Sequence, residues 1–136
     1  METVKAGCFL INKEQRTLAL VYRQKRNDVS FPKGHKEQGE SIQDCAIRET
    51  AEETKRVANI VKEVEPYVER YSTDRGEKCV CYMYYAFDNG PSDNDSLDTH
   101  DVLWIDFDKI EQALTYPSQK QVWNEIKSTI YKITEN

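Results

Sequence analysis

The segment GHKEQGESIQDCAIRETAEE, residues 34–53, is the most informative part of this sequence. Its second half predicts a helix, because Ser41 is a good N-cap residue and the helical pattern continues to about Thr54. Three acidic residues fall on one face of that helix, at positions i, i+3 and i+4: Glu49, Glu52 and Glu53. Like charges at this spacing repel one another, so the cluster calls for an explanation.

Two interpretations of the glutamate cluster are open. Most charge runs are solvated faces, and such a face needs no ligand. On a helical wheel, however, Ile42, Cys45 and Ala46 fall on the same side, which places the carboxylates at the edge of the core. Carboxylates there need a cation or strong hydrogen bonds. A hard divalent ion, Mg²⁺ or Mn²⁺ as its substitute, suits oxygen ligands.

Two residues near the cluster each have two possible roles. Arg48 either fixes a carboxylate in a bidentate pair or forms an exposed ion pair of little energetic worth. Glu40 either reaches the same cation or only places favourable charge near the start of the helix.

The loop before the helix reads Phe31-Pro32-Lys33-Gly34-His35-Lys36. Gly34 allows the backbone to approach a ligand closely. The charge of phosphate groups can be offset by three neighbours: Lys33, His35 and Lys36. Basic loops are common, so this stretch by itself indicates little.

The composition narrows the class of protein. The 136 residues, 38% hydrophobic and 32% charged, predict one folded domain over residues 1–136. A net charge of −5 argues against an extended nucleic-acid-binding surface. No stretch approaches transmembrane length, and the start of the chain does not resemble a signal peptide. We interpret the four cysteines as reduced thiols of a cytoplasmic protein, since their spacing does not suit zinc.

Hydrophobic patterning predicts the other elements. We expect strands over residues 4–11, 17–22, 61–72, 78–87 and 102–107, and a functional loop over residues 24–40. Residues 88–101 form an acidic loop in this prediction. Two helices follow, over 108–114 and 118–130, and the second carries an apolar stripe of Val122, Ile126 and Ile130. The order of elements predicts an α/β fold, an α/β/α sandwich around a mixed sheet.

The spacing Gly34, five residues, Glu40, seven residues, Arg48-Glu49, two residues, Glu52-Glu53 resembles the Nudix box, G-x5-E-x7-R-E-U-x-E-E-x-G-U. The resemblance extends over most of the chain. Three positions depart from the box: Thr50 replaces an apolar residue, Lys55 the glycine, and Arg56 another apolar residue. A glycine at the box position suits a left-handed helix C-terminus, so Lys55 either adopts that conformation at some cost or ends the helix differently.

The resemblance implies a magnesium-dependent hydrolase that cleaves a pyrophosphate bond. The metal ligands it implies are Glu49, Glu52 and Glu53, with Glu40 assisting and the backbone carbonyl of Lys33 as a further ligand. Arg48 would orient a glutamate. For the general base we favour Glu52, and the loop alternatives are Asp95, Asp98 and Asp101, which are otherwise simply solvated.

The Pro32-Lys33-Gly34-His35 loop and the tail over residues 113–117 resemble those of the diadenosine tetraphosphate hydrolase subgroup. That resemblance implies a small nucleotide substrate, phosphate binding by Lys78, and contact of Tyr82 and Tyr116 with a base. Tyr82 equally suits ordinary sheet packing. Alternative substrates are a nucleoside triphosphate, an RNA 5′ end and a diphosphoinositol polyphosphate, for which Arg23, Lys25 and Arg26 would add charge to the loop. A nucleotide sensor without activity is the rival of another class.

Overall fold

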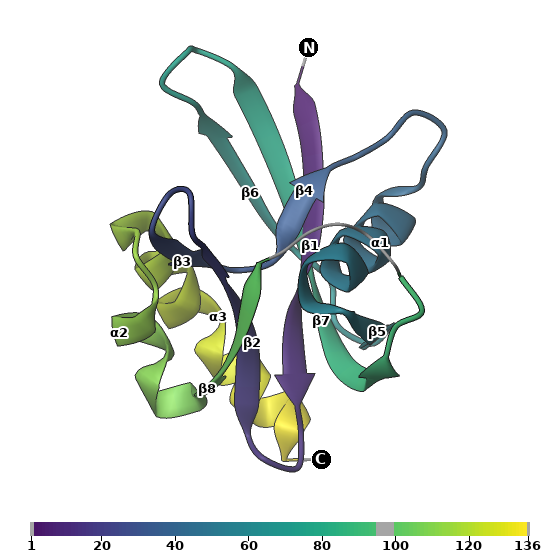
Figure 1. The fold of residues 1–136 in the computed structure, drawn as a ribbon, viewed down its shortest axis with the longest axis vertical. Coiled ribbons are helices and arrows are strands. Elements are labelled where there is room, and N and C mark those ends of the chain that lie inside the picture. Colours follow the sequence, from purple (N-terminus) through teal and green to yellow (C-terminus); the bar gives the residue numbers. More distant parts are fainter. Residues whose placement is uncertain (1, 95–99, 136) are drawn as a thin grey trace.

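The computed structural model describes residues 2–94 and 100–135, which form one sheet flanked by helices (Figure 1). The strands are β1 (Thr3–Asn12), β2 (Thr17–Arg23), β3 (Asp28–Ser30), β4 (Lys33–His35), β5 (Arg56–Ile60), β6 (Tyr67–Ser72), β7 (Lys78–Pro91) and β8 (Asp101–Asp106). The helices are α1 (Ile42–Thr54), α2 (Ile110–Ala113) and α3 (Pro117–Thr134), and a 3-10 turn, η1 (Phe107–Lys109), leads into α2.

The strands join in a mixed sheet whose central order is β3-β2-β1-β7-β5. β1 and β7 run parallel, with Ala6 opposite Tyr82, and the remaining pairs are antiparallel. β4 adds to β1, β6 to β7 and β8 to β2. Pairing with the long β1 strand therefore holds β4 in place, and with it the expected functional loop over residues 24–40.

Helices cover both faces of this sheet, which confirms the predicted α/β/α arrangement (Figure 1). On one face, Phe9 and Ile11 pack with the predicted stripe of α3. On the other, Ala6 and Cys8 pack against α1, whose Cys45 is fully buried. Small side chains on this second face allow α1 to lie close to the sheet.

The sequence prediction was wrong in three places. The expected loop over residues 24–40 contains β3 and β4, which are too short, at three residues each, to show a hydrophobic period. The expected strand over residues 61–72 begins only at Tyr67, and β5 precedes it. β7 continues to Pro91, inside the expected acidic loop, where the Arg56 guanidinium donates two hydrogen bonds of 2.8 Å to Asp88.

Both ends of α1 have specific caps. The Ser41 hydroxyl accepts a hydrogen bond of 3.0 Å from the Asp44 N–H, as the capping pattern predicts. At the other end, Lys55 adopts the left-handed conformation, with φ 61° and ψ 28°, and its N–H donates to the Ala51 carbonyl. Its ammonium group also donates to the Glu52 carbonyl at 2.9 Å. The backbone of Lys55 thus ends the helix, and its side chain caps one of the last helical carbonyls. The first of the two alternatives for Lys55 therefore holds.

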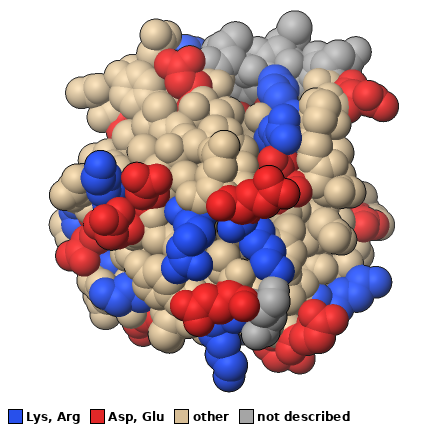
Figure 2. Space-filling view, turned by 90° about the horizontal axis from the view of Figure 1, so that it is seen from below, with Lys and Arg blue, Asp and Glu red and all other residues tan. Residues whose placement is uncertain are grey.

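The surface seen in Figure 2 carries interleaved acidic and basic side chains. This face shows no broad basic area of the kind that binds nucleic acid through its phosphates. All four cysteines lie in the described part of the chain, and each is buried with a free thiol. Among the described helices, none is long and apolar enough to cross a bilayer.

Candidate active site

Arg48 is the centre of an ion-pair network on α1. Its Nε and Nη2 donate to the two oxygens of Glu40 at 2.6 and 3.0 Å, and its Nη1 donates to Glu49 and Glu52 at 2.9 Å each. A further bond of 3.0 Å runs from Nη2 to the His35 carbonyl. The hydrogen bonds from Arg48 lower the pKa of Glu40 to about 2. Arg48 thus orients three glutamates, where the resemblance implied one.

The glutamates lie at the edge of the core, as the helical wheel predicted. Their side chains are between 14% and 26% exposed, which rules out a fully solvated face. The members of this set are Glu40, Glu49, Glu52 and Glu53.

Glu49 approaches the backbone of β4 closely. A Cβ built on Gly34 would lie 1.7 Å from Oε2 of Glu49, so residue 34 must be glycine for this carboxylate to occupy its place. Gly34 is paired with Ala6 of β1 and has little freedom to move away. Gly34, predicted to let the backbone approach a ligand closely, is in contact with a glutamate carboxylate and also lines the cavity described below.

Glu53 connects α1 to the start of β4. Its Oε1 accepts a hydrogen bond of 3.0 Å from the backbone N–H of Lys33. Its Oε2 lies 3.9 Å from Nε2 of His100. His100 was not among the predicted site residues, because nothing in its local sequence distinguishes it from a solvated loop residue.

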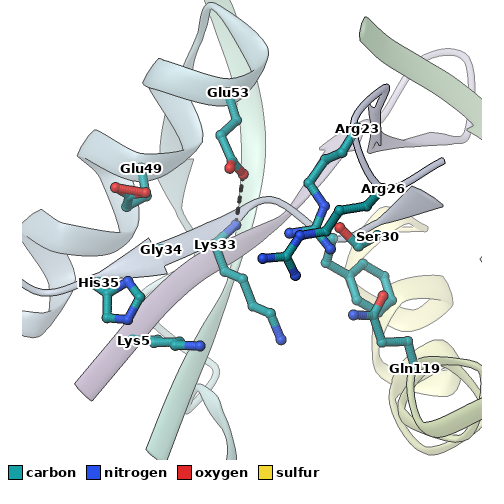
Figure 3. Close-up of a pocket in the computed structure, with 11 residues that line it drawn as sticks. Lys5, Arg23, Arg26, Ser30, Lys33, Gly34, His35, Glu49, Glu53 and Gln119 are labelled. Carbon is teal, nitrogen blue, oxygen red and sulfur yellow. Dashed lines mark hydrogen bonds between the residues drawn. The ribbon is translucent and has the colours of Figure 1, made fainter. Parts of the chain in front are cut away.

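A cavity of about 380 Å³ opens beside these glutamates (Figure 3). Two carboxylates, Glu49 and Glu53, project from α1 on one side of it. The side chains around the remainder are mostly basic: Lys5, Arg23, Arg26, Lys33 and His35. The cavity thus places carboxylates and cationic groups around one space, which suits a polyanionic ligand.

The sequence analysis missed three lining residues: Lys5, Ser30 and Gln119. Lys5 is the one charged residue within the predicted strand over residues 4–11, and that contrast is a signal that the analysis did not use. Gln119 comes from the start of α3, and its nearness to the loop depends on tertiary structure alone. Lys5 and Lys33 lie over the same aromatic ring, with ammonium groups 5.6 and 5.5 Å from the centroid of Tyr71.

Several predicted site residues lie elsewhere. Lys78 is exposed at the start of β7, and Tyr82 packs on the face of the sheet that α1 covers. Neither lines this cavity, and the Lys36 ammonium group donates to the Glu37 carbonyl. Their roles toward a substrate remain predictions, as does that of Tyr116, which lies outside this cavity.

The loop alternatives for the general base divide into two groups. Asp95 and Asp98 lie outside the described residues. Asp101 is exposed at the first position of β8, opposite Tyr22, and does not line the cavity.

The chemistry of the site fits a hard divalent ion. Four carboxylates gather here and the Arg48 guanidinium pairs with three of them, which leaves the excess of anionic oxygens that such an ion requires. In residues 2–94 and 100–135, no three acidic, histidine or cysteine side chains converge closely enough to hold an ion in the present arrangement. Arg48 donates hydrogen bonds to three of the glutamates, and the Lys33 N–H donates to the fourth. Binding of a metal ion therefore requires some of these side chains to turn toward the cavity.

A family model and a curated relative each match most of this chain. A model of the NUDIX domain matches residues 1–125. The 8-oxo-(d)GTP phosphatase of Mycolicibacterium smegmatis is 31% identical over 106 residues, which are 77% of this chain and 32% of that protein. The chain therefore spans about a third of the length of this relative.

Solved structures share the fold at low sequence identity. A NUDIX hydrolase from Nitrosomonas europaea superposes with a TM-score of 0.77 at 19% identity, over 95% of this chain and 90% of that one. The Ap4A hydrolase of C. elegans, in a binary complex, has a TM-score of 0.74 at 18% identity, over 96% and 98%. The family model covers the loop, the glutamate helix and the sheet on which both are mounted, and on that ground the chain belongs to the NUDIX family.

Proposed function

We propose that this chain is a magnesium-dependent pyrophosphohydrolase whose preferred substrate is a dinucleoside polyphosphate. One observation carries the proposal: Glu49 and Glu53 face a cavity whose remaining lining is mostly basic and includes Lys5, Arg23, Arg26 and Lys33. A carboxylate pair suits a metal ion, and a wall of cations suits a chain of phosphates. The two together are what hydrolysis of a phosphoanhydride requires.

The glutamates of α1 hold the metal in this proposal. Glu49 and Glu53 are the ligands that already face the cavity, and Glu52 and Glu40 complete the set. A bound divalent ion supplies charge neutralisation on the phosphate oxygens and lowers the pKa of a water molecule. Arg48 keeps the carboxylates of Glu40, Glu49 and Glu52 on one side of the helix, since each accepts a charged hydrogen bond from it.

The general base in this proposal is Glu52. Its carboxylate is on the same helix face as the ligands and is held by Arg48 at 2.9 Å, which fixes its direction. Because Glu52 does not line the cavity in the present arrangement, its carboxylate must turn from Arg48 toward the cavity to accept a proton from water.

The lysines of the loop and of β1 bind the phosphates. Lys33 and Lys5 come from paired strands, and both ammonium groups lie over the Tyr71 ring. The ring face keeps two like charges near each other without a carboxylate between them. Their donors are thereby left facing the cavity, where they offset the charge that the phosphates bring.

The choice of a dinucleoside polyphosphate rests on the loop and tail that resemble the diadenosine tetraphosphate hydrolase subgroup, and on the Ap4A hydrolase among the structural neighbours. A nucleoside triphosphate is the second candidate, because the M. smegmatis relative is named an 8-oxo-(d)GTP phosphatase. Both substrates present a chain of phosphates to the same cationic wall.

A substrate panel with Mg²⁺ tests the proposal. It contains diadenosine tetraphosphate, 8-oxo-dGTP, dGTP, an RNA with a 5′-triphosphate and a diphosphoinositol polyphosphate, with products resolved by anion-exchange chromatography. We expect the highest kcat/KM for diadenosine tetraphosphate. A higher value for 8-oxo-dGTP assigns the second candidate, and binding without turnover on all five identifies a sensor.

Two controls accompany the panel. Excess chelator should abolish turnover, and full activity in chelator contradicts the metal requirement. Glu53→Gln should lower kcat by orders of magnitude, because glutamine keeps the shape of the side chain but lacks the charged oxygen that would bind the metal. The matched variant Glu63→Gln, at an exposed position away from the cavity, should keep the activity of the parent.

A further inference from the structure

A second cavity, of about 600 Å³, continues from the first. The two share most of the cationic wall: Lys5, Arg23, Arg26 and Lys33. Glu49 and Glu53 do not line the second cavity, which is bounded by Glu69 and by two aromatic rings, Tyr71 from β6 and Tyr116 just before α3. The shared cations therefore stand where the two cavities meet.

Arg23 is the best held of these shared cations. Its Nε and Nη2 donate to the two oxygens of Asp28 at 2.7 and 2.5 Å. The Asp28 side chain is 1% exposed, and a carboxylate so deeply buried requires charged or hydrogen-bonding partners. The hydrogen bonds from Arg23 keep the pKa of Asp28 below its ordinary value, so the pair stays ionised at neutral pH.

Arg23 also retains donors that the protein does not use. A guanidinium has five N–H groups, and two of them point to Asp28. The other three have no acceptor within residues 2–94 and 100–135. Because the side chain is 29% exposed and lines both cavities, these donors are available to a ligand there. The planar fork of a guanidinium matches two oxygens of a phosphate group.

Tyr116 completes the arrangement through its hydroxyl group, which donates to Asp28 Oδ2 at 2.5 Å. Its neighbour Thr115 is fixed by two hydrogen bonds to Val29. The hydroxyl of Thr115 accepts from the Val29 N–H at 2.7 Å, and the Thr115 N–H donates to the Val29 carbonyl at 3.1 Å. The segment before α3 is thus clamped to β3, with Tyr116 directed at the carboxylate that holds Arg23.

We propose that Arg23 binds a substrate phosphate where the two cavities meet, and that Asp28 and Tyr116 are the positioning residues that hold its guanidinium there. The proposal rests on the proposed function. The phosphate concerned lies beyond the one attacked at the glutamate helix, so the arrangement favours substrates with long phosphate chains. Tyr116 serves through its hydroxyl group, whereas a residue that only stacks on a base serves through its ring.

Tyr116→Phe tests this role because it removes the hydroxyl and keeps the ring. We expect KM for diadenosine tetraphosphate to rise about tenfold, the worth of one charge-assisted hydrogen bond, with kcat within about twofold of the parent. Tyr22→Phe is the matched control: its hydroxyl donates to Asn27 at 2.8 Å in the same hairpin, and it lines neither cavity. Its KM should stay unchanged.

A second variant separates positioning from general damage to the fold. Arg23→Lys keeps a positive charge but loses the fork, so it should raise KM at least as much as Tyr116→Phe. The double variant should be no worse than Arg23→Lys alone, because Tyr116 acts through Arg23. Additive effects in the double variant, or an unchanged KM in Tyr116→Phe, would overturn the proposal.

A binding measurement distinguishes failure of this inference from failure of the proposed function. Calorimetric titration with inorganic tripolyphosphate, without divalent metal, reports on the cationic wall even if no nucleotide is hydrolysed. We expect Tyr116→Phe to weaken this binding about tenfold relative to Tyr22→Phe. Equal affinities in the two variants contradict the role of Arg23, and a weakened affinity without any turnover contradicts the proposed function alone.

Discussion

Gly34 of β4 lies directly against the carboxylate of Glu49 on α1. A Cβ on residue 34 would meet the carboxylate carbon of Glu49 at 2.1 Å and its Oε2 at 1.7 Å. This contact explains why a glycine and a glutamate fifteen positions apart belong to one motif. The carboxylate of Glu49 occupies the space that a side chain at residue 34 would need.

Gly34→Ala should therefore damage activity and stability together. The methyl group displaces Glu49 or strains β4, and we expect kcat to fall about 100-fold and the free energy of unfolding to fall by about 1–3 kcal/mol. Steady-state kinetics and urea denaturation measure the two effects.

The double variant Gly34→Ala/Glu49→Ala is the control for this clash. Removal of the Glu49 carboxylate leaves room for the methyl group, so the double variant should be as stable as Glu49→Ala while remaining inactive. A double variant that is still less stable would show that the strain at residue 34 has another source, such as its pairing with Ala6.

Glu40 should make the free energy of unfolding depend on pH in the acidic range. Arg48 lowers its pKa from 4.5 to about 2, and a carboxylate with a depressed folded-state pKa stabilises the fold above its unfolded pKa. That contribution is present above about pH 4.5 and is lost as the pH falls toward 2. Glu40→Gln should be less stable than the parent at pH 7, by about 1–2 kcal/mol.

The difference between Glu40→Gln and the parent should narrow below pH 4.5. Urea denaturation at a series of pH values measures it, with Glu63→Gln as the exposed control. A difference that stays constant from pH 7 to pH 3 would indicate a loss of packing rather than of the ion pair.

The left-handed backbone conformation of Lys55 lowers the stability of the fold, and the hydrogen bond from its ammonium group offsets part of that loss. Lys55→Ala keeps the positive φ and loses the ammonium group that caps the Glu52 carbonyl, so it should lower stability by about 0.5–1 kcal/mol. Lys55→Gly removes the conformational strain and should be more stable than Lys55→Ala by about 1 kcal/mol. Thermal denaturation ranks the three proteins, and equal stability of the Ala and Gly variants would contradict the strain.

Local patterns were sufficient to predict the glutamate helix. Ser41, the spacing of the acidic residues and the buried Cys45 all lie within one helix, where a period of 3.6 residues relates sequence to surface directly. The left-handed Lys55 was also one of two anticipated outcomes, because a helix end poses the same conformational problem in any context.

The basic residues Arg23, Arg26 and Lys33 were named from the sequence, but the contacts that hold the cationic wall in place could not be predicted in the same way. Tyr116 and Asp28 are 88 positions apart, and their contact depends on the docking of α3 against β3. β3 and β4 are held by pairing with β2 and β1 rather than by their own composition. Lys5 was missed, although a single charge in an apolar strand can be recognised without knowing the fold.

The lysines allow a direct comparison between the cavity and the family resemblance. Lys33→Ala should raise KM by about tenfold or more, because Lys33 lines both cavities. Lys78→Ala should have the smaller effect, since Lys78 is exposed at the start of β7 and lines neither cavity. Kinetics at two salt concentrations measure both, and an equal rise in KM for Lys78→Ala would support the phosphate-binding role that the resemblance implies.

Diadenosine tetraphosphate should be cleaved asymmetrically, into AMP and ATP. The carboxylates proposed to hold the metal are at one end of the joined cavities, and the aromatic rings of Tyr71 and Tyr116 are at the other. A substrate fixed at both ends presents one phosphorus atom to the attacking water, and the fixed distance selects which. Hydrolysis in ¹⁸O-labelled water, followed by mass spectrometry, shows whether AMP or ATP carries the label and so identifies that atom. Equal yields of ADP from the two halves would mean that the substrate binds symmetrically about the metal, which the one-sided placement of Glu49 and Glu53 does not allow.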